Sequence, residues 1–268
     1  MSASLYAGLA SRGFRRYATY RSATLAGIFT NTVFGVIISY TYIALWVERP
    51  QLGGYGIAQA LTFAWVAQAL IMPVGLFGGG IVADYSERVR SGAVATDLQR
   101  PAPLLAVRLA EDLGRAAYAL LTRGIAPMLV GALLFPLAWP SSVSTWLLFA
   151  LSITLAVVIG FALRYLLGLL AFWIIDTSGP ASMLVVLQIF ASGSALPLVT
   201  FPGVLRRICE LLPFRCLVQV PCDVLLREDT GTGSLPLIGL QLLWATTLLG
   251  LGAVLTRAAV RTVVVQGG

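Results

Sequence analysis

Residues 143–163 read VSTWLLFALSITLAVVIGFAL and contain no charged side chain. An α-helix needs about 20 apolar residues to cross the hydrocarbon core of a bilayer, where the backbone must satisfy its own hydrogen bonds. The stretch therefore predicts a transmembrane helix over about 143–164, and it decides the fold class, an all-α membrane protein. The sequence leaves open whether this helix continues into the short apolar stretch that ends before Asp176.

The composition of the whole chain agrees with that assignment. Hydrophobic residues make up 58% of the 268 residues and charged residues only 11%, whereas a soluble domain has about 25% charged residues. The chain has too few polar side chains to cover a water-facing surface. Disorder requires low hydrophobicity and high charge, so a disordered protein is excluded as well.

Five further apolar runs are predicted to span the membrane, which gives six transmembrane helices in a polytopic protein. Their approximate ranges are 23–47, 57–82, 116–138, 181–199 and 235–256. The first run is too long for the core of a signal peptide and is expected to remain in the chain. The third run contains Arg123 near its start, where a long side chain can reach the interface.

The distribution of arginine predicts the orientation. All 18 basic residues are arginine, and the chain contains no lysine and no histidine. With the N-terminus inside the cell, 13 arginines fall on the cytoplasmic side and 5 on the outer side, which agrees with the positive-inside rule. Both termini are therefore expected in the cytoplasm. This bias also explains the net charge of +7, so nucleic acid is not expected as a partner.

The missing residue types exclude several functions. A phosphate-binding loop needs a lysine, so this chain is not expected to bind ATP or Mg²⁺ by such a loop. Without histidine, most serine and cysteine nucleophile systems and many zinc sites lack their imidazole, and no bound cofactor or metal is expected. The predicted span cores contain no acidic residue, which disfavours an ion-coupled carrier. A membrane-embedded enzyme and a structural scaffold are further alternatives.

The N-terminal segment, residues 1–22, is predicted to form an amphipathic helix. A helical projection of residues 5–21 places Arg12, Arg15, Arg16 and Thr19 on one face and Tyr6, Ala10, Gly13 and Tyr17 on the other. An arginine face opposite an aromatic face suits an elbow helix in the plane of the headgroups. A plain tail that sets the topology is the alternative.

Residues 84–115 form the main polar block, with five acidic and five basic side chains. We expect this block to lie in water on the cytoplasmic side. Gly92 can end a short helix and Pro101 can begin another. The block is either a solvated loop or a docking surface for a cytoplasmic partner.

Residues 200–234 are too apolar for a free loop, yet prolines divide them into stretches too short to span. We therefore predict a re-entrant helical hairpin that dips into the outer leaflet between the fifth and sixth spans. Its marker residues are Pro197, Pro202, Pro213, Phe214 and Pro221. All three cysteines, Cys209, Cys216 and Cys222, also lie here. Either a disulfide between two of them on an oxidising face or simple apolar packing fits the sequence.

In order and placement, these segments resemble the membrane subunit of an ABC exporter of the ABC-2 type. The resemblance covers nearly the whole chain, 1–268, as a single transmembrane domain. It rests on the basic N-terminal segment, the six spans and two motifs. The motifs are Glu87…Arg90-Ser91-Gly92…Leu98-Gln99-Arg100-Pro101 and Leu196-Pro197…Phe201-Pro202…Leu212-Pro213-Phe214…Pro221. The charge and the cysteines of the second segment depart from the family's pattern.

The resemblance implies half of a transporter in a bacterial plasma membrane. Two permeases, either identical or sister chains, would work with two separate ATPase subunits that bind ATP and Mg²⁺. Residues 84–101 would be the coupling element that seats on the ATPase, through Glu87, Arg88, Arg90, Gly92, Arg100 and Pro101. Cargo would be a drug-like, amphiphilic or lipidic molecule, with polysaccharide also open.

In the family the export path lies between the two permeases and is lined mainly by the second and fifth spans. Mapped onto this chain, that path would be lined by Thr62, Trp65, Gln68, Met72, Leu187, Gln188, Ser192 and Ser194. Packing between helices is the alternative role for each of these residues, because Ser, Thr and Gln commonly bond across spans.

Overall fold

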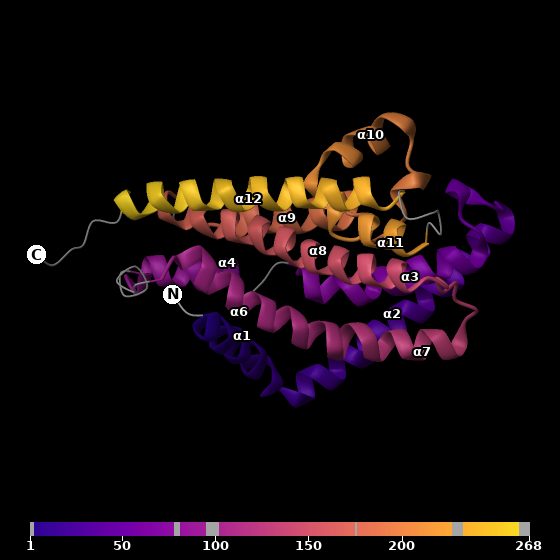
Figure 1. The fold of residues 1–268 in the computed structure, drawn as a ribbon, viewed down its shortest axis with the longest axis horizontal. Coiled ribbons are helices and arrows are strands. Elements are labelled where there is room, and N and C mark those ends of the chain that lie inside the picture. Colours follow the sequence, from indigo (N-terminus) through magenta and orange to yellow (C-terminus); the bar gives the residue numbers. More distant parts are fainter. Residues whose placement is uncertain (1–2, 78–80, 95–101, 175, 227–232, 263–268) are drawn as a thin grey trace, which may run out of the picture.

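The computed structural model describes residues 3–77, 81–94, 102–174, 176–226 and 233–262, and every regular element in these ranges is a helix. The long helices run side by side along one axis, and α1 begins and α12 ends toward the same end of the bundle (Figure 1). Five helical segments are long and apolar enough to cross a membrane. They are α2 (Arg21–Glu48), α3 (Ile57–Val74), Leu104–Leu134, Val143–Phe172 and α12 (Leu235–Thr262).

Helix α3 lies at the centre of the bundle and is buried over most of its length. The helix ends at Val74, eight residues before the predicted end at residue 82. Gly75 follows in the left-handed conformation with φ 71°, and its N–H closes the helix on the carbonyls of Ile71 and Met72. Only glycine adopts this conformation without strain. A separate helix, α4 (Ile81–Arg90), follows.

The third span begins earlier than the predicted residue 116. Helix α6 (Leu104–Ala119), the π-helical segment η2 (Leu120–Ile125) and α7 (Ala126–Leu134) form one continuous segment. The polar block therefore divides, and only residues before 104 lie outside this helix. The expectation that the whole block lies in water is wrong for Asp112, which is 3% exposed.

Helix α8 (Val143–Leu169) continues into the apolar stretch before Asp176, which the sequence left open. The helix passes Arg164 without a break, and the 3-10 turn η3 (Leu170–Phe172) extends it. Arg164 does not end the helix because its guanidinium is paired with a carboxylate inside the protein.

The predicted fifth span, 181–199, forms only the 14-residue helix α9 (Ser178–Ala191). It stops there because Gly193 has φ 84° and directs the chain away from the helix axis. A Cβ on Gly193 would lie 2.8 Å from Oε1 of Gln219, so the turn also depends on the missing side chain. The 3-10 turn η4 (Leu198–Thr200) follows.

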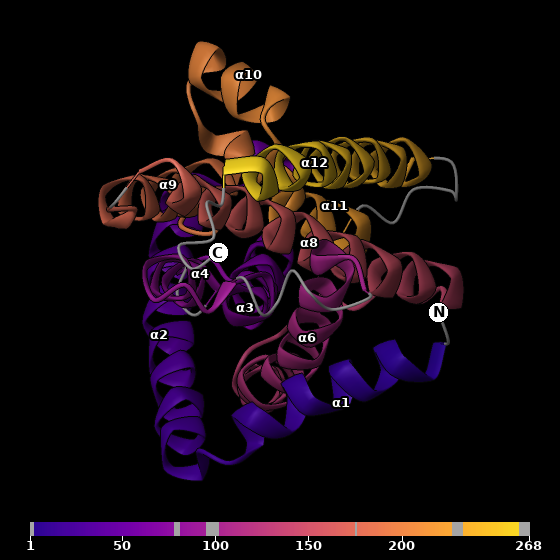
Figure 2. The ribbon, with the colours of Figure 1, turned by 90° about the vertical axis from the view of Figure 1, so that its left-hand side faces the viewer.

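Helix α1 (Ala3–Ala18) runs across the bundle and crosses α6 at close range (Figure 2). On the predicted apolar face, Gly13 is buried and Tyr6 and Ala10 are partly buried, but Tyr17 is exposed. The predicted arginine face is exposed, at Arg12, Arg15 and Arg16. Two glycines permit the approach. A Cβ on Gly13 would lie 2.1 Å from the Glu111 carbonyl oxygen, and one on Gly114 would lie 1.9 Å from that of Ala10.

The segment between α9 and α12 consists of short helices, and Pro202 and Pro213 mark the starts of the first two of them, whereas Pro221 lies inside the third. These helices are α10 (Gly203–Leu211), the 3-10 turn η5 (Pro213–Cys216) and α11 (Gln219–Leu226). Helix α11 is buried against α3 and α8, whereas α10 stands away from the bundle in both views (Figures 1 and 2). The three cysteines are buried free thiols, which is the packing alternative rather than a disulfide.

Candidate functional site

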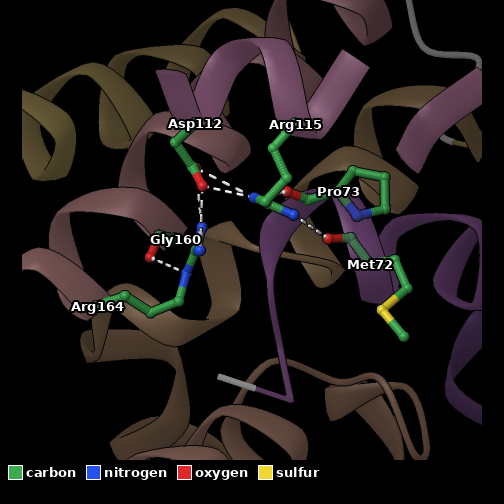
Figure 3. A network of polar contacts seen from close by, with 6 residues as sticks. All are labelled: Met72, Pro73, Asp112, Arg115, Gly160 and Arg164. Carbon is green, nitrogen blue, oxygen red and sulfur yellow. Dashed lines mark hydrogen bonds and ion pairs between the residues drawn. The ribbon is translucent and has the colours of Figure 1, made fainter. Parts of the chain in front are cut away.

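A buried ion network joins three helices beside the region expected to couple to an ATPase (Figure 3). Asp112 of α6 accepts two hydrogen bonds from Arg164 of α8, at 3.0 Å from Nη2 and 3.3 Å from Nη1. Arg115, one turn further along α6, binds the same carboxylate through Nε and Nη2. Asp112 and Arg164 are almost completely buried.

The same network closes the end of α3. Arg115 donates to the carbonyl oxygens of Met72 and Pro73, each at 2.8 Å. Both carbonyls lie in the last turn of α3, where a cation is favourable, and that of Met72 also accepts the Gly75 N–H. Arg164 lies against the Gly75 backbone, where a Cβ would come within 2.6 Å of the guanidinium.

Three charges meet here in a site shielded from water, and their balance determines its stability. A buried charge is tolerated only when it is paired and hydrogen-bonded, since the loss of hydration costs several kcal/mol per ion. Removing the only carboxylate would leave two buried guanidinium groups. The network therefore fixes the relative positions of α3, α6 and α8.

The sequence did not identify Asp112 as a buried group. Asp112 belongs to the candidate span Leu104–Leu134 but precedes the predicted span of 116–138, so the expectation about acidic residues in the span cores did not cover it. Asp112 and Arg115 lie one helical turn apart among the apolar residues of α6. This spacing was the available signal for a buried ion pair. Two guanidinium partners hold this carboxylate in its charged form, which does not suit a group that must take up and release a proton in a carrier.

Helix α4 carries part of the predicted coupling element and is anchored on one side. Arg108 of α6 lies 3.5 Å from Asp84 and over the ring of Tyr85, at 5.3 Å. Tyr85 is 1% exposed, and burial together with the neighbouring Tyr165 raises the pKa of its hydroxyl. Ser86 Oγ lies 2.6 Å from Thr177 Oγ1, immediately before α9. Helix α4 is thus tied to α6, α8 and the start of α9.

The predicted coupling residues lie along α4 and the turn after it. Glu87 is exposed on α4, and Arg88 is bonded to Asp84 at 3.1 Å. Arg90 is the last residue of α4, and Gly92 follows with φ 73°. Arg100 and Pro101 lie outside the described residues.

The α3 residues expected along the export path are mostly buried in the interior of this protein. The Trp65 ring is completely buried and packs on Gly35 of α2 and Gly131 of α7, where any Cβ would collide with it. Thr62 accepts a hydrogen bond from the Ala138 backbone N–H at 2.7 Å. This burial favours the helix-packing alternative for both residues. Gln68 is also buried and Met72 is partly buried.

The α9 residues expected along the path are separate from those of α3. Gln188 is completely buried, and its amide has no hydrogen-bond partner among the described residues. Ser192 and Ser194 lie in the turn that ends α9, where the Ser192 carbonyl accepts the Gln219 N–H at 2.9 Å. Leu187 is 38% exposed. The structure therefore does not bring the predicted path residues together into one lining.

A second polar centre, which the sequence did not reveal, anchors the segment between α9 and α12. Tyr55 Oη donates to Asp223 Oδ1 at 2.6 Å, and Gln219 Nε2 donates to the same oxygen at 3.0 Å. Gln219 Oε1 accepts the Leu198 N–H at 2.8 Å. The i, i+4 pair Gln219 and Asp223 in an apolar helix was the available signal. These bonds fix α11 against the loop that precedes α3 and against η4. Within the described ranges, no group of three acidic or cysteine residues is arranged to hold a metal ion.

Comparison with known proteins gives the family. A family profile described as ABC-2 family transporter protein matches residues 30–267. The chain belongs to the ABC-2 transporter family. It is a multi-pass membrane protein and a permease subunit of an ABC transporter, a transport component that is not itself catalytic and that in general associates with ABC ATPase subunits. No curated protein gives a match.

Proposed function

We propose that this ABC-2 permease forms half of an ATP-driven exporter in a bacterial plasma membrane, with both termini in the cytoplasm. The observation that carries the proposal is the placement of α4. The helix is attached to the bundle through Asp84, Tyr85 and Ser86. Glu87 is exposed on it, shortly before the turn at Ser91 and Gly92. A partner that displaces such a helix would displace several spans with it.

In the proposed mechanism, a separate ATPase subunit binds ATP and Mg²⁺ and moves α4 when it closes. The Ser86–Thr177 contact would pass the motion to α9, and the network around Asp112 would pass it to α3, α6 and α8. An equilibrium shifts only when a ligand binds its two states unequally. The ATPase must therefore hold α4 more tightly in one nucleotide state than in the other.

A second permease, either the same chain or a sister chain, would complete the path. Helix α9 supports this part of the proposal, because Met183, Val186 and Phe190 form an exposed apolar face and are 65%, 66% and 51% exposed. The apolar surface of the spans suits an amphiphilic or lipidic cargo moved outward.

The proposal is tested by reconstituting the permease with its co-purified ATPase subunit in liposomes. We expect the triple variant Glu87→Ala, Arg90→Ala and Arg100→Ala to lose at least about 90% of ATP-dependent transport while still inserting, since contacts of this kind contribute about 1.5–3 kcal/mol each. Arg207→Ala, on exposed α10, is the control and should transport normally. Unchanged transport by the triple variant would refute the coupling role. Uphill transport by the isolated chain would refute the ATP-driven function.

A further inference from the structure

A cavity of about 390 Å³ opens where the α1–α2 turn, the end of α3, the π-helical segment and α8 meet. Its lining contains three arginines, Arg115, Arg123 and Arg164, and no acidic residue. Four of the other ten lining residues are aromatic. They are Tyr17, Tyr20, Phe77 and Tyr118.

The charges around this cavity do not balance. Arg115 and Arg164 share one carboxylate, that of Asp112, which lies behind the lining. Arg123 makes no ion pair with a described residue, and the one hydrogen bond that its side chain makes to the described residues runs from Nη2 to the Ala23 carbonyl at 2.9 Å. The cavity therefore has three guanidinium groups in its lining and only one nearby carboxylate, which two of them share. At membrane depth an uncompensated charge is costly, so the site favours an anion.

The protein holds Arg123 in place from two sides. The side chain lies on Gly27 of α2, where a Cβ would come within 2.3 Å of Cζ. Asn31 Nδ2 donates to the Arg123 backbone carbonyl at 2.9 Å. A guanidinium has five N–H groups, and Arg123 uses one of them within the chain. The remaining donors are available to a ligand.

The surroundings of the cavity favour a lipid as the source of the anion. Tyr20, in the lining, is 66% exposed. Leu25 and Leu121, each next in sequence to a lining residue on α2 or η2, are 67% and 53% exposed. Arginine and tyrosine together are typical of the boundary between headgroups and acyl chains. Basic pockets between spans bind anionic lipid headgroups.

We propose that this cavity binds the phosphate of an anionic phospholipid from the adjacent leaflet, which is the inner leaflet in the expected orientation. Arg123 is the principal contact, Arg115 and Arg164 add positive charge, and the acyl chains lie along the exposed apolar faces of α2 and η2. Because the lipid would bridge the α1–α2 turn and the π-helical segment, it would fix the elbow helix to the bundle. The site does not depend on ATP or on a partner subunit.

The test uses the full chain, purified in detergent and titrated with phosphatidylglycerol or phosphatidylcholine, with bound lipid counted by native mass spectrometry. We expect phosphatidylglycerol to bind at least about tenfold more tightly, because the quaternary ammonium of phosphatidylcholine would add a further positive charge beside the three arginines. Arg123→Gln should lower that affinity about tenfold. Arg207→Gln removes the same charge from exposed α10 and should leave it unchanged.

A second variant separates geometry from charge. Gly27→Ala keeps every arginine but displaces the Arg123 guanidinium, and should weaken phosphatidylglycerol binding severalfold. The proposal fails if both lipids bind equally, or if Arg123→Gln and Arg207→Gln have the same effect. Full displacement of phosphatidylglycerol by millimolar inorganic phosphate would identify a site for a soluble anion and would overturn the lipid assignment.

Discussion

At Asp112 a single carboxylate faces two guanidinium groups inside the protein. The variant Asp112→Asn keeps the size of the side chain but leaves both arginines without a counter-charge. We expect it to lower the free energy of unfolding by about 3 kcal/mol, since breaking a buried pair by removing one partner is strongly destabilising. Unfolding of the detergent-purified protein by denaturant measures the change.

The exposed pair of Arg206 and Glu210 provides the matched control. Its Nε–Oε1 distance is 2.7 Å, shorter than the Arg164–Asp112 contact, yet both side chains are more than a third exposed. Glu210→Gln should therefore change the stability by less than about 1 kcal/mol. Equal losses in the two variants would show that Asp112 is not the structural centre of the network.

The buried thiols of Cys216 and Cys222, between α9 and α12, are expected to react slowly. Burial raises the pKa of Cys216 to about 12 and that of Cys222 well above its ordinary value. At pH 8 the thiolate of Cys216 is then scarcer than that of a free cysteine by about a thousandfold. Maleimide labelling in native and denatured protein measures the ratio, with Ser11→Cys on exposed α1 as a fast-reacting control. Rapid native labelling of Cys216, or a mass showing a disulfide, would contradict the burial.

At the scale of elements, the crossing of α1 and α6 depends on small residues. Gly114→Ala places a methyl group within 1.9 Å of the Ala10 carbonyl oxygen, so one helix must move. We expect a loss of about 1–3 kcal/mol and a more protease-sensitive α1, as overpacking at a backbone contact cannot be relieved by a rotamer change. Gly8→Ala, where nothing lies within 4 Å, should be neutral or slightly stabilising. Thermal unfolding and limited proteolysis of both variants measure the difference.

The sequence predicted where apolar helices occur more reliably than where they end. Charge-free runs placed α2, α8 and α12 correctly, because membrane spans need such runs. It could not predict that α3 ends at Gly75, since the left-handed turn is stabilised by Arg115 and Arg164, which lie far along the chain. Nor could it predict that Asp112 enters the protein, because its partner on α8 is brought near only by the fold. Hydropathy treats each charged residue separately, whereas the burial of a charged side chain depends on whether an oppositely charged partner lies beside it.

At the scale of the molecule, the number of crossings decides where the termini lie. Five long spans alone would place the two ends of the chain on opposite sides of the membrane. The contacts place them together. Gly13 of α1 lies against Glu111, the residue before Asp112, and Asp112 binds Arg164. The next residue of α8, Tyr165, lies 2.7 Å from Thr256 near the end of α12. We therefore expect helix α9 to contribute a sixth crossing.

That crossing is unusual because α9 is short. Its 14 residues span about 21 Å, less than the roughly 30 Å of hydrocarbon, so the turn at Gly193 and η4 must complete the passage. We expect a fluorescent protein that folds only in the cytoplasm to fluoresce when fused to either terminus. A phosphatase active only outside should work when fused after Pro202, just before α10. If α9 instead lay on one side of the membrane, the phosphatase fused after Pro202 would be inactive, and the two terminal reporters would fall on opposite sides.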